Sequence, residues 1–382
     1  MIRERAAKEP VLILEAGDAF ASRIEPRVSP EGLRARAELL VDAYNRMGLH
    51  AYTPGERDLA LGLDGLKSLA EQAKFPFLAA NLTGPGGEPL FKGSLVQKIG
   101  DLSIGVIGLT GQKTGYPEDR LKQMGLTVAD PVAAARAEAE RLKGEGAQLL
   151  VLLSHLGPGE DDAVVKAVPE IRFVLGGHSG RMTRRPRMLG ARAPATAAWM
   201  LSSGSRGKYL GRLELYPAGS GPDALSFVDG GERDQLITEI AGHQRSLERT
   251  RQRMEQIKTK PLRPNDDEKR RSSRIAAMER SLERTQKQIA DKQTKLEGLK
   301  RPVEAQAFFR STLLPVEPKI AGDPGIEKQV KTLKASGALK PLPRKAPGKG
   351  DLVPFRPSPK PIRGKPLKLG APKALAPRNK AR

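Results

Sequence analysis

The sequence lacks cysteine altogether, and it is poor in aromatic residues and in long apolar runs. The absence of Cys excludes disulfides, thiolate metal ligands and thiol nucleophiles. Nine Phe, five Tyr and one Trp stand against 31 Pro and 40 Gly, so a uniformly globular chain is not expected. No apolar run approaches the roughly 18 residues that a membrane helix needs, and we therefore expect no membrane-spanning segment.

Basic residues outnumber acidic ones, but mainly in the later part of the chain. The formal charge is +22, yet residues 1–230 carry 29 basic and 27 acidic residues. Residues 231–301 carry 19 basic and 12 acidic residues, and residues 340–382 carry 13 and one. Since the first 230 residues are nearly neutral, a main domain that binds the phosphate backbone of nucleic acid is not expected.

The first 230 residues alternate short apolar runs with helical patterns. This alternation is typical of a layered α/β architecture, and we take residues 1–230 as one domain. We expect helices at 30–47, 63–73, 131–143 and 160–168, and strands at 11–14, 49–53, 76–82, 93–99, 102–109, 148–154, 172–175, 199–202 and 209–216.

From residue 231 the apolar residues repeat every seven positions instead. Ile240 and Leu247 share a heptad position in one arm, and Ile275 and Leu282 share one in the other. Residues 231–301 are therefore expected to form two helices that pair as a coiled-coil hairpin. Polar Thr and Lys residues at other seam positions are expected to weaken the pairing of these two helices. Self-association or a partner helix is one interpretation, and a solvated helix pair without chemistry is the other.

Two further segments follow. In residues 302–339 we expect an isolated strand at Phe308–Val316 and a short helix at Pro324–Leu333. Residues 340–382 hold ten Pro and thirteen basic residues, which is typical of a disordered tail. Such a tail can anchor the protein to an anionic surface or can be a plain solvated extension.

Histidine is scarce, with four residues in the chain, and two of them occupy matching places. His155 follows one expected strand, and His178 follows the next. Asp18 follows the first strand in the same way. Ligand sites of open α/β sheets collect at the carboxyl ends of strands, so these side chains can converge. Two imidazoles and a carboxylate suit a divalent cation, whereas a single strand-end His is more often a structural hydrogen-bonding residue.

Five short motifs follow one another along the first 180 residues. They are VLILEAGD (Val11–Asp18), FLAAN (Phe77–Asn81), IGVIGL (Ile104–Leu109), LLSHLG (Leu152–Gly157) and LGGHS (Leu175–Ser179). In this order they resemble the metallophosphatase domain of the 5'-nucleotidase family, within the calcineurin-like phosphoesterases. The resemblance spans roughly residues 10–216 and is most specific at the two His motifs. It implies an α/β/β/α sandwich with two divalent ions at the strand ends.

The resemblance also implies roles for single residues. Asp18 resembles the carboxylate that bridges the two ions, and His155 and His178 resemble ligands of the second ion. The family's Gly-Asn-His-Glu motif stands here as Gly55-Glu56-Arg57-Asp58. Glu56 thus takes the place of a ligating Asn, and Arg57 that of the His that helps to protonate the leaving group. Together with Arg57, Asn81 is expected to face the phosphate.

The departures from the family concern the first ion. The opening Asp-x-His motif has no counterpart, and Gly180 stands where a further ligand is often found. We therefore expect one divalent ion (Mn, Mg, Zn or Ca) rather than two, held by Asp18, Glu56, His155 and His178. Arg57 cannot give up a proton near neutral pH, but its guanidinium can clamp a phosphate oxygen.

These features favour a divergent metal-dependent phosphoesterase that hydrolyses a phosphate ester with metal-activated water, at an activity reduced by the missing second ion. The rival interpretation is a non-catalytic scaffold, in which a degenerate phosphatase domain presents the coiled coil and the basic tail to a partner or an anionic surface. Nucleic-acid association through the tail alone is a third. The aromatics on which nucleotide-cleaving members stack the base have little counterpart, so no nucleotide preference is expected.

Other charged residues and the start of the chain allow weaker expectations. The basic cluster at 181–187 either steers an anionic substrate or is a solvated loop. Asp161 and Asp162 are interpreted as charges at a helix N-terminus rather than as ligands. Val11–Leu14 is too short for the apolar core of a secretory signal, which predicts a cytoplasmic protein. If the natural start lies further upstream, the family resemblance implies the periplasm or the cell envelope.

Overall fold

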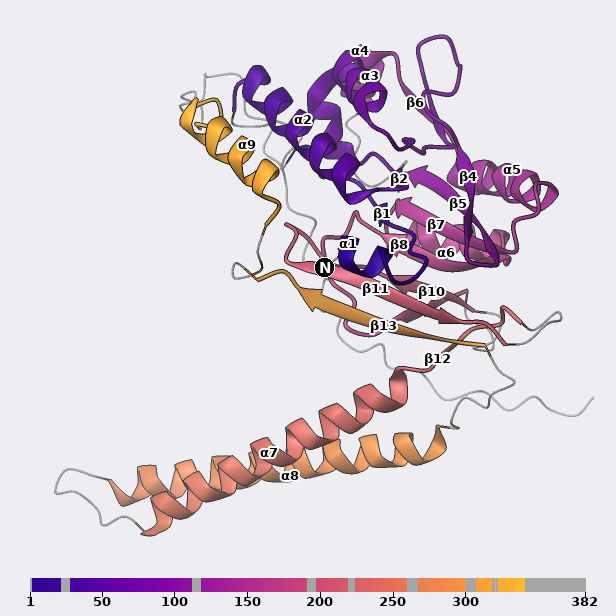
Figure 1. The fold of residues 1–382 in the computed structure, drawn as a ribbon. Coiled ribbons are helices and arrows are strands. Elements are labelled where there is room, and N and C mark those ends of the chain that lie inside the picture. Colours follow the sequence, from indigo (N-terminus) through magenta and orange to yellow (C-terminus); the bar gives the residue numbers. More distant parts are fainter. Residues whose placement is uncertain are drawn as a thin grey trace, which may run out of the picture. The chain divides into compact units, whose positions relative to one another are not determined.

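The computed structural model describes most of the first 340 residues (Figure 1). The expected tail lies outside the described residues, apart from Lys340. The described residues are 2–21, 28–111, 118–190, 197–218, 224–259, 267–299, 307–317, 320 and 322–340.

The helices and strands follow the expected order. The described helices are α1 (Ile2–Ala6), α2 (Pro30–Met47), the 3-10 helix η1 (Glu56–Leu61), α3 (Gly62–Gln72), α4 (Glu118–Met124), α5 (Pro131–Gly144), α6 (Pro158–Ala167), α7 (Glu232–Thr259), α8 (Glu268–Gly298) and α9 (Pro324–Ala335). The described strands are β1 (Leu14–Glu15), β2 (Ala51–Tyr52), β3 (Leu82–Thr83), β4 (Ser94–Ile99), β5 (Leu102–Thr110), β6 (Thr127–Val128), β7 (Leu149–His155), β8 (Ile171–Gly176), β9 (Arg187–Leu189), β10 (Ala198–Leu201), β11 (Tyr209–Tyr216), β12 (Val228–Asp229) and β13 (Phe308–Pro315).

The first three expected strands are shorter than the sequence predicts. β1 and β2 have two residues each and pair in parallel. The strand expected at 76–82 is wrong for most of its length, because Phe77 and Leu78 form only single bridges, to Tyr52 and Lys92. Apolar runs there reflect burial rather than a continuous strand ladder, since Phe77 and Leu78 are both almost fully buried.

The main sheet has six strands in the order β4-β5-β7-β8-β10-β9. Its four central strands are parallel, and β4 and β9 pair antiparallel at the edges. Helices α5 and α6 cover one face, where Ala139, Leu142 and Val164 pack on Leu152 of β7. The other face packs against a second sheet, β11-β13-β12 (Figure 1). The expected layered α/β fold is confirmed.

The strand β13 corrects an expectation. Phe308–Val316 was expected to be isolated, but β13 lies between β11 and β12 and pairs with both. Phe309 is fully buried, with its ring 5.2 Å from that of Phe173 and 5.1 Å from that of Trp199. Nothing within these few residues could have identified a strand partner about a hundred positions earlier.

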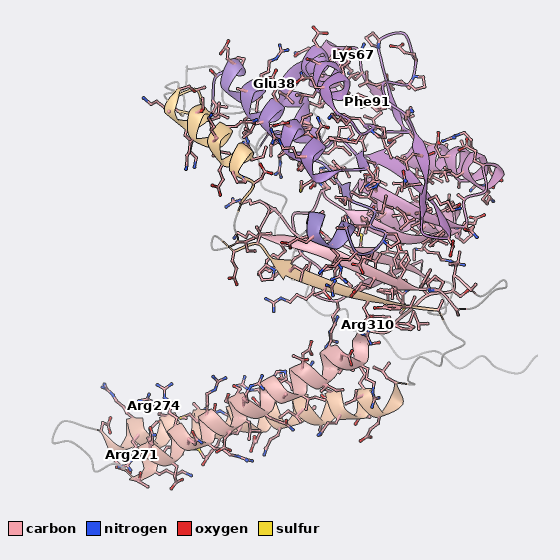
Figure 2. The ribbon with its side chains drawn as sticks, viewed as in Figure 1. Glu38, Lys67, Phe91, Arg271, Arg274 and Arg310 are labelled. Carbon is pink, nitrogen blue, oxygen red and sulfur yellow. The ribbon has the colours of Figure 1, made fainter. Side chains whose placement is uncertain are left out.

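The α7–α8 pair is antiparallel. Lys295 lies 2.6 Å from Glu232 at one end, and Lys258 lies 3.6 Å from Glu279 towards the other. The seam buries apolar residues at the heptad positions, namely Leu236, Ile240, Leu247 and Leu282. Figure 2 shows Arg271 and Arg274 near the beginning of α8, where the charged side chains point outward. None of the helices in the described ranges is long and apolar enough to span a bilayer.

Candidate metal centre

The candidate site lies at the carboxyl ends of two pairs of parallel strands. β7 and β8 are neighbours, and His155 ends β7 while His178 comes two residues after β8. β1 and β2 are also neighbours. Asp18 follows β1, and Glu56 begins η1 after β2. Because parallel strands end at the same edge, four side chains that are far apart in the sequence meet there.

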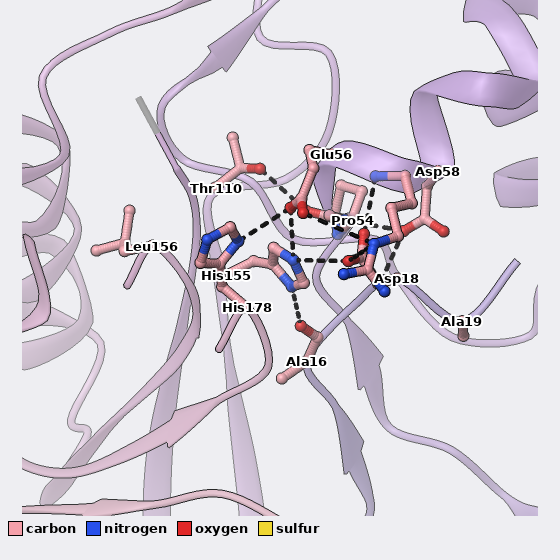
Figure 3. A network of polar contacts seen from close by, with 12 residues as sticks. Ala16, Asp18, Ala19, Pro54, Glu56, Asp58, Thr110, His155, Leu156 and His178 are labelled. Carbon is pink, nitrogen blue, oxygen red and sulfur yellow. Dashed lines mark hydrogen bonds and ion pairs between the residues drawn. The ribbon is translucent and has the colours of Figure 1, made fainter. Parts of the chain in front are cut away.

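Glu56 is the centre of this group (Figure 3). Its Oε2 lies 2.9 Å from Nε2 of His155 and 3.1 Å from Nδ1 of His178. Oδ2 of Asp18 lies 3.4 Å from the same Nε2 of His155. The structure therefore brings together all four side chains that the sequence predicts as metal ligands.

Arg57 contacts the two carboxylates of this group, those of Asp18 and Glu56. Its backbone N–H donates to Oδ1 of Asp18 at 2.8 Å, and its Nε lies 3.2 Å from Oδ2. Nε also lies 3.9 Å from Oε1 of Glu56. The side chain is 40% exposed, against 8% for Glu56. Asp18 thus holds the partly exposed guanidinium beside these side chains.

Asp58 is a site residue that the sequence analysis missed. Its carboxylate is fully buried and accepts hydrogen bonds from the Tyr52 hydroxyl at 2.6 Å and from the backbone N–H groups of Gly55 and Asp18 at 2.9 and 3.0 Å. Burial first, and then the charge of Asp18, raises the pKa of Asp58 to about 6. The signal was an acidic residue three positions after Gly55, which is typical of a helix N-terminus.

Three glycines leave room for the His155 ring. A Cβ at Gly17 would lie 2.7 Å from Nδ1 of His155, one at Gly55 would lie 2.5 Å from Nε2, and one at Gly177 would lie 3.0 Å from Nδ1. Gly17 and Asp18 also have φ of +95° and +59°, in the left-handed region that glycine tolerates best. The backbone is thus shaped closely around this imidazole.

The electrostatics of the group favour a positive charge at its centre. Nδ1 of His155 donates to the carbonyl of Ala16, which can only accept, so Nε2 faces the carboxylates. Burial lowers the pKa of His155, but hydrogen bonds to Asp18 and Glu56 outweigh burial and raise it to about 10. Burial likewise raises the pKa of Glu56, and the two imidazoles outweigh it and hold that pKa well below its usual range.

The donor set fits a divalent cation. Glu56, His155 and His178 each offer a ligand atom, and these atoms all lie within 4.8 Å of one another. Asp18 adds a fourth donor beside them. Imidazole nitrogen together with carboxylate oxygen is a common ligand set for Zn and Mn.

Asn81 does not face this group, which corrects the expectation that it contacts a phosphate. It is fully buried, and its Nδ2 donates to the carbonyls of Thr110 and Ala129 at 2.7 and 3.3 Å. Its Oδ1 accepts from the Thr110 N–H at 3.0 Å. The Thr110 hydroxyl in turn donates to the Pro54 carbonyl at 3.0 Å, so Asn81 supports the loop that carries Glu56.

Asp161 lies in the first turn of α6, as expected, but it is not a solvated charge. Its side chain is buried and accepts a hydrogen bond from the Ser154 hydroxyl at 2.5 Å, and burial raises its pKa to about 6. Asp162 is more exposed and lies 2.5 Å from Lys166. Asp161 therefore supports the end of β7 next to His155.

Comparisons with known proteins find relatives among the 5'-nucleotidases and metallophosphoesterases. No family model matches the chain. The chain is 25% identical to human 5'-nucleotidase over 240 residues, which cover 61% of this chain and 40% of that protein. It is 30% identical to the metallophosphoesterase YunD of Bacillus subtilis over 182 residues, which cover 46% of this chain and 36% of that protein. The chain thus spans less than half the length of these relatives.

One solved structure that aligns with this chain is also a 5'-nucleotidase. The 5'-nucleotidase precursor of Thermus thermophilus aligns with a TM-score of 0.46 and 23% identity. The alignment covers 55% of this chain and 43% of that one.

Proposed function

We propose that this chain, a divergent relative of the 5'-nucleotidase-type metallophosphatases, hydrolyses phosphate esters of small molecules with the help of one divalent cation. Asp18, Glu56, His155 and His178 would hold the cation. The observation that carries the proposal is the convergence of the Glu56 carboxylate on two imidazoles, one from each of two neighbouring parallel strands.

The chain's own residues have separable roles in this proposal. A divalent cation supplies Lewis-acid polarisation of a phosphoryl oxygen and of a water molecule. Arg57, held by Asp18 and partly exposed, donates charge-assisted hydrogen bonds to the phosphate oxygens. Since a guanidinium keeps its protons, the departing alcohol must take its proton from water. Hydrolysis should therefore depend strongly on how good the leaving group is.

A second candidate function is the non-catalytic scaffold. The same contacts also fit this candidate, because Oε2 of Glu56 already lies within hydrogen-bonding distance of both imidazoles. Such a group is satisfied by protons alone, without a cation. In that case the helical hairpin at 231–301 would bind a partner helix or a second copy, and the tail at 340–382 would bind an anionic surface.

Activity and metal content separate the two candidates. The purified chain is assayed on an aryl phosphate with Mn or Mg, beside His155→Ala and His178→Ala, with His243→Ala in α7 as a control that also removes an imidazole. Phosphatase function predicts activity that both site substitutions abolish and the control retains. Activity indifferent to the site substitutions, or a wild-type protein without activity or bound metal, would contradict it.

A further inference from the structure

Two loops beside His178 carry exposed basic side chains without acidic partners among the residues that the structure describes. We call the exposed side chains of Arg181, Arg184, Arg206 and Lys208 the cationic patch. No acidic side chain within the described ranges forms an ion pair with any of them, whereas the neighbouring Arg185 pairs with Glu239 at 2.5 Å. In the sequence itself, residues 171–213 hold nine basic residues and no acidic one.

The two loops lie side by side. Met182 forms an antiparallel bridge with Ser203. The Thr183 N–H donates to the Ser202 carbonyl at 2.9 Å, and the Ser202 N–H donates to the Thr183 hydroxyl at 2.7 Å. A Cβ at Gly180 would lie 3.7 Å from that of Ser205. Arg181 and Arg206, each adjacent to one of these contacts, therefore belong to one surface.

This surface borders the candidate metal centre. The N–H of Gly180 donates to the carbonyl of Gly177 at 3.4 Å, which closes a tight turn around His178. Arg181 follows three positions after His178, so their Cα atoms are at most about 11 Å apart even in an extended chain. An arginine side chain can therefore reach a molecule bound at His178.

The backbone at Arg206 adds a second observation. Its φ is +63°, a left-handed conformation that is uncommon outside glycine, between Gly204 and Gly207, which have φ of +87° and +60°. The Arg206 side chain on this turn is exposed and has no ion-pair partner in the described ranges. The guanidinium is therefore available to an anionic ligand.

We propose that the cationic patch binds a second anionic group of the substrate, so that the preferred phosphate ester carries a carboxylate or another phosphate on its alcohol part. This inference rests on the proposed phosphatase function. The two carboxylates of Asp18 and Glu56 balance the charge of one divalent ion, which leaves Arg57 as the cation at the phosphate. The patch supplies the further positive charge for the rest of the substrate.

The kinetic test compares two esters that differ in one anionic group, 3-phosphoglycerate and glycerol 3-phosphate. The wild type is expected to prefer 3-phosphoglycerate about tenfold in kcat/KM, through KM. The double substitution Arg181→Ala with Arg206→Ala is expected to remove that preference. Arg274→Ala in α8 removes an exposed charge elsewhere (Figure 2) and should leave the preference in place. Equal use of the two esters by the wild type, or an equal response to Arg274→Ala, would overturn the inference.

A binding titration keeps the inference separate from catalysis. 3-Phosphonopropionate and propylphosphonate cannot be hydrolysed and differ by one carboxylate, and calorimetry gives their Kd values. The wild type should bind the carboxylate-bearing phosphonate about tenfold more tightly, and the double variant should not. If no ester is hydrolysed, the proposed function fails, while a Kd difference of this kind would still support the patch. Equal Kd values for the two phosphonates would overturn the patch whatever the activity.

Discussion

At the scale of single residues, the charge of Glu56 controls the protonation of the site. Its carboxylate contacts both imidazoles, and with Asp18 it raises the pKa of His155 to about 10. A neutral amide at this position would keep an oxygen but not the charge. The pH response of the metal-free protein should therefore report on Glu56.

We expect the metal-free wild type to lose stability as the pH rises towards 10. A group whose pKa is higher in the folded state contributes stability that is complete below its unfolded pKa of about 6.5 and is lost as the pH passes its folded pKa. In Glu56→Gln the pKa of His155 should fall, so the decline should be shallower. Thermal melts with a chelator at several pH values measure this. Parallel curves for the two proteins would contradict it.

Arg57 should determine which esters are cleaved. In the proposed function it takes the place of a proton donor but cannot donate a proton, so aryl esters with good leaving groups should be hydrolysed much faster than alkyl esters. In Arg57→His the alkyl-to-aryl rate ratio should rise about tenfold or more, because an imidazolium can protonate the alcohol. Arg57→Lys, which keeps the charge, is the control. A ratio that is the same in all three proteins would show that Arg57 does not limit proton transfer.

Gly55 should be intolerant of any side chain. Its Cβ would overlap Asp18 and lie 2.5 Å from Nε2 of His155. Gly55→Ala is therefore expected to weaken cation binding at least tenfold, as measured by calorimetry. Gly242→Ala in α7 is the control, because nothing lies within 4 Å of its Cβ position and alanine should gain up to about 1 kcal/mol of helix stability. Unchanged cation affinity in Gly55→Ala would mean that the ring does not need this space.

At the scale of helices and strands, the sequence predicted those elements whose ends are set by neighbouring residues. α2 spans Pro30–Met47 as expected, because the Ser29 hydroxyl caps its start and Gly48 ends it in a left-handed conformation. His155 and His178 were found from strand ends. Asn81 was expected at the phosphate, and Asp58 was given no role. Their hydrogen-bond partners, such as Thr110 for Asn81 and Tyr52 for Asp58, could not be identified from the sequence.

The strand β13 allows the clearest stability prediction. Phe309 is fully buried in the core between the two sheets, whereas Phe308 is partly exposed and stacks on Tyr216 at 4.5 Å. Phe309→Ala should lower the free energy of unfolding by about 4 kcal/mol, and Phe308→Ala by about 1 kcal/mol. Denaturant unfolding measures both. Similar small losses would mean that β13 does not complete the sheet.

At the scale of the whole molecule, the chain joins a nearly neutral α/β part to a basic helical hairpin. The basic excess of residues 231–301 lies outside the candidate site, so net charge alone says little about the chemistry. The cationic patch is different, because it stands on the loops next to His178.

The most direct test of the candidate metal centre is a Mn titration of the chelator-treated chain, followed by metal analysis after gel filtration. We expect about one retained ion per wild-type chain, and almost none in the double variant His155→Ala with His178→Ala, while His243→Ala retains the ion. A wild-type chain that retains no ion, or a double variant that retains as much as the wild type, would contradict the assignment of these side chains as ligands.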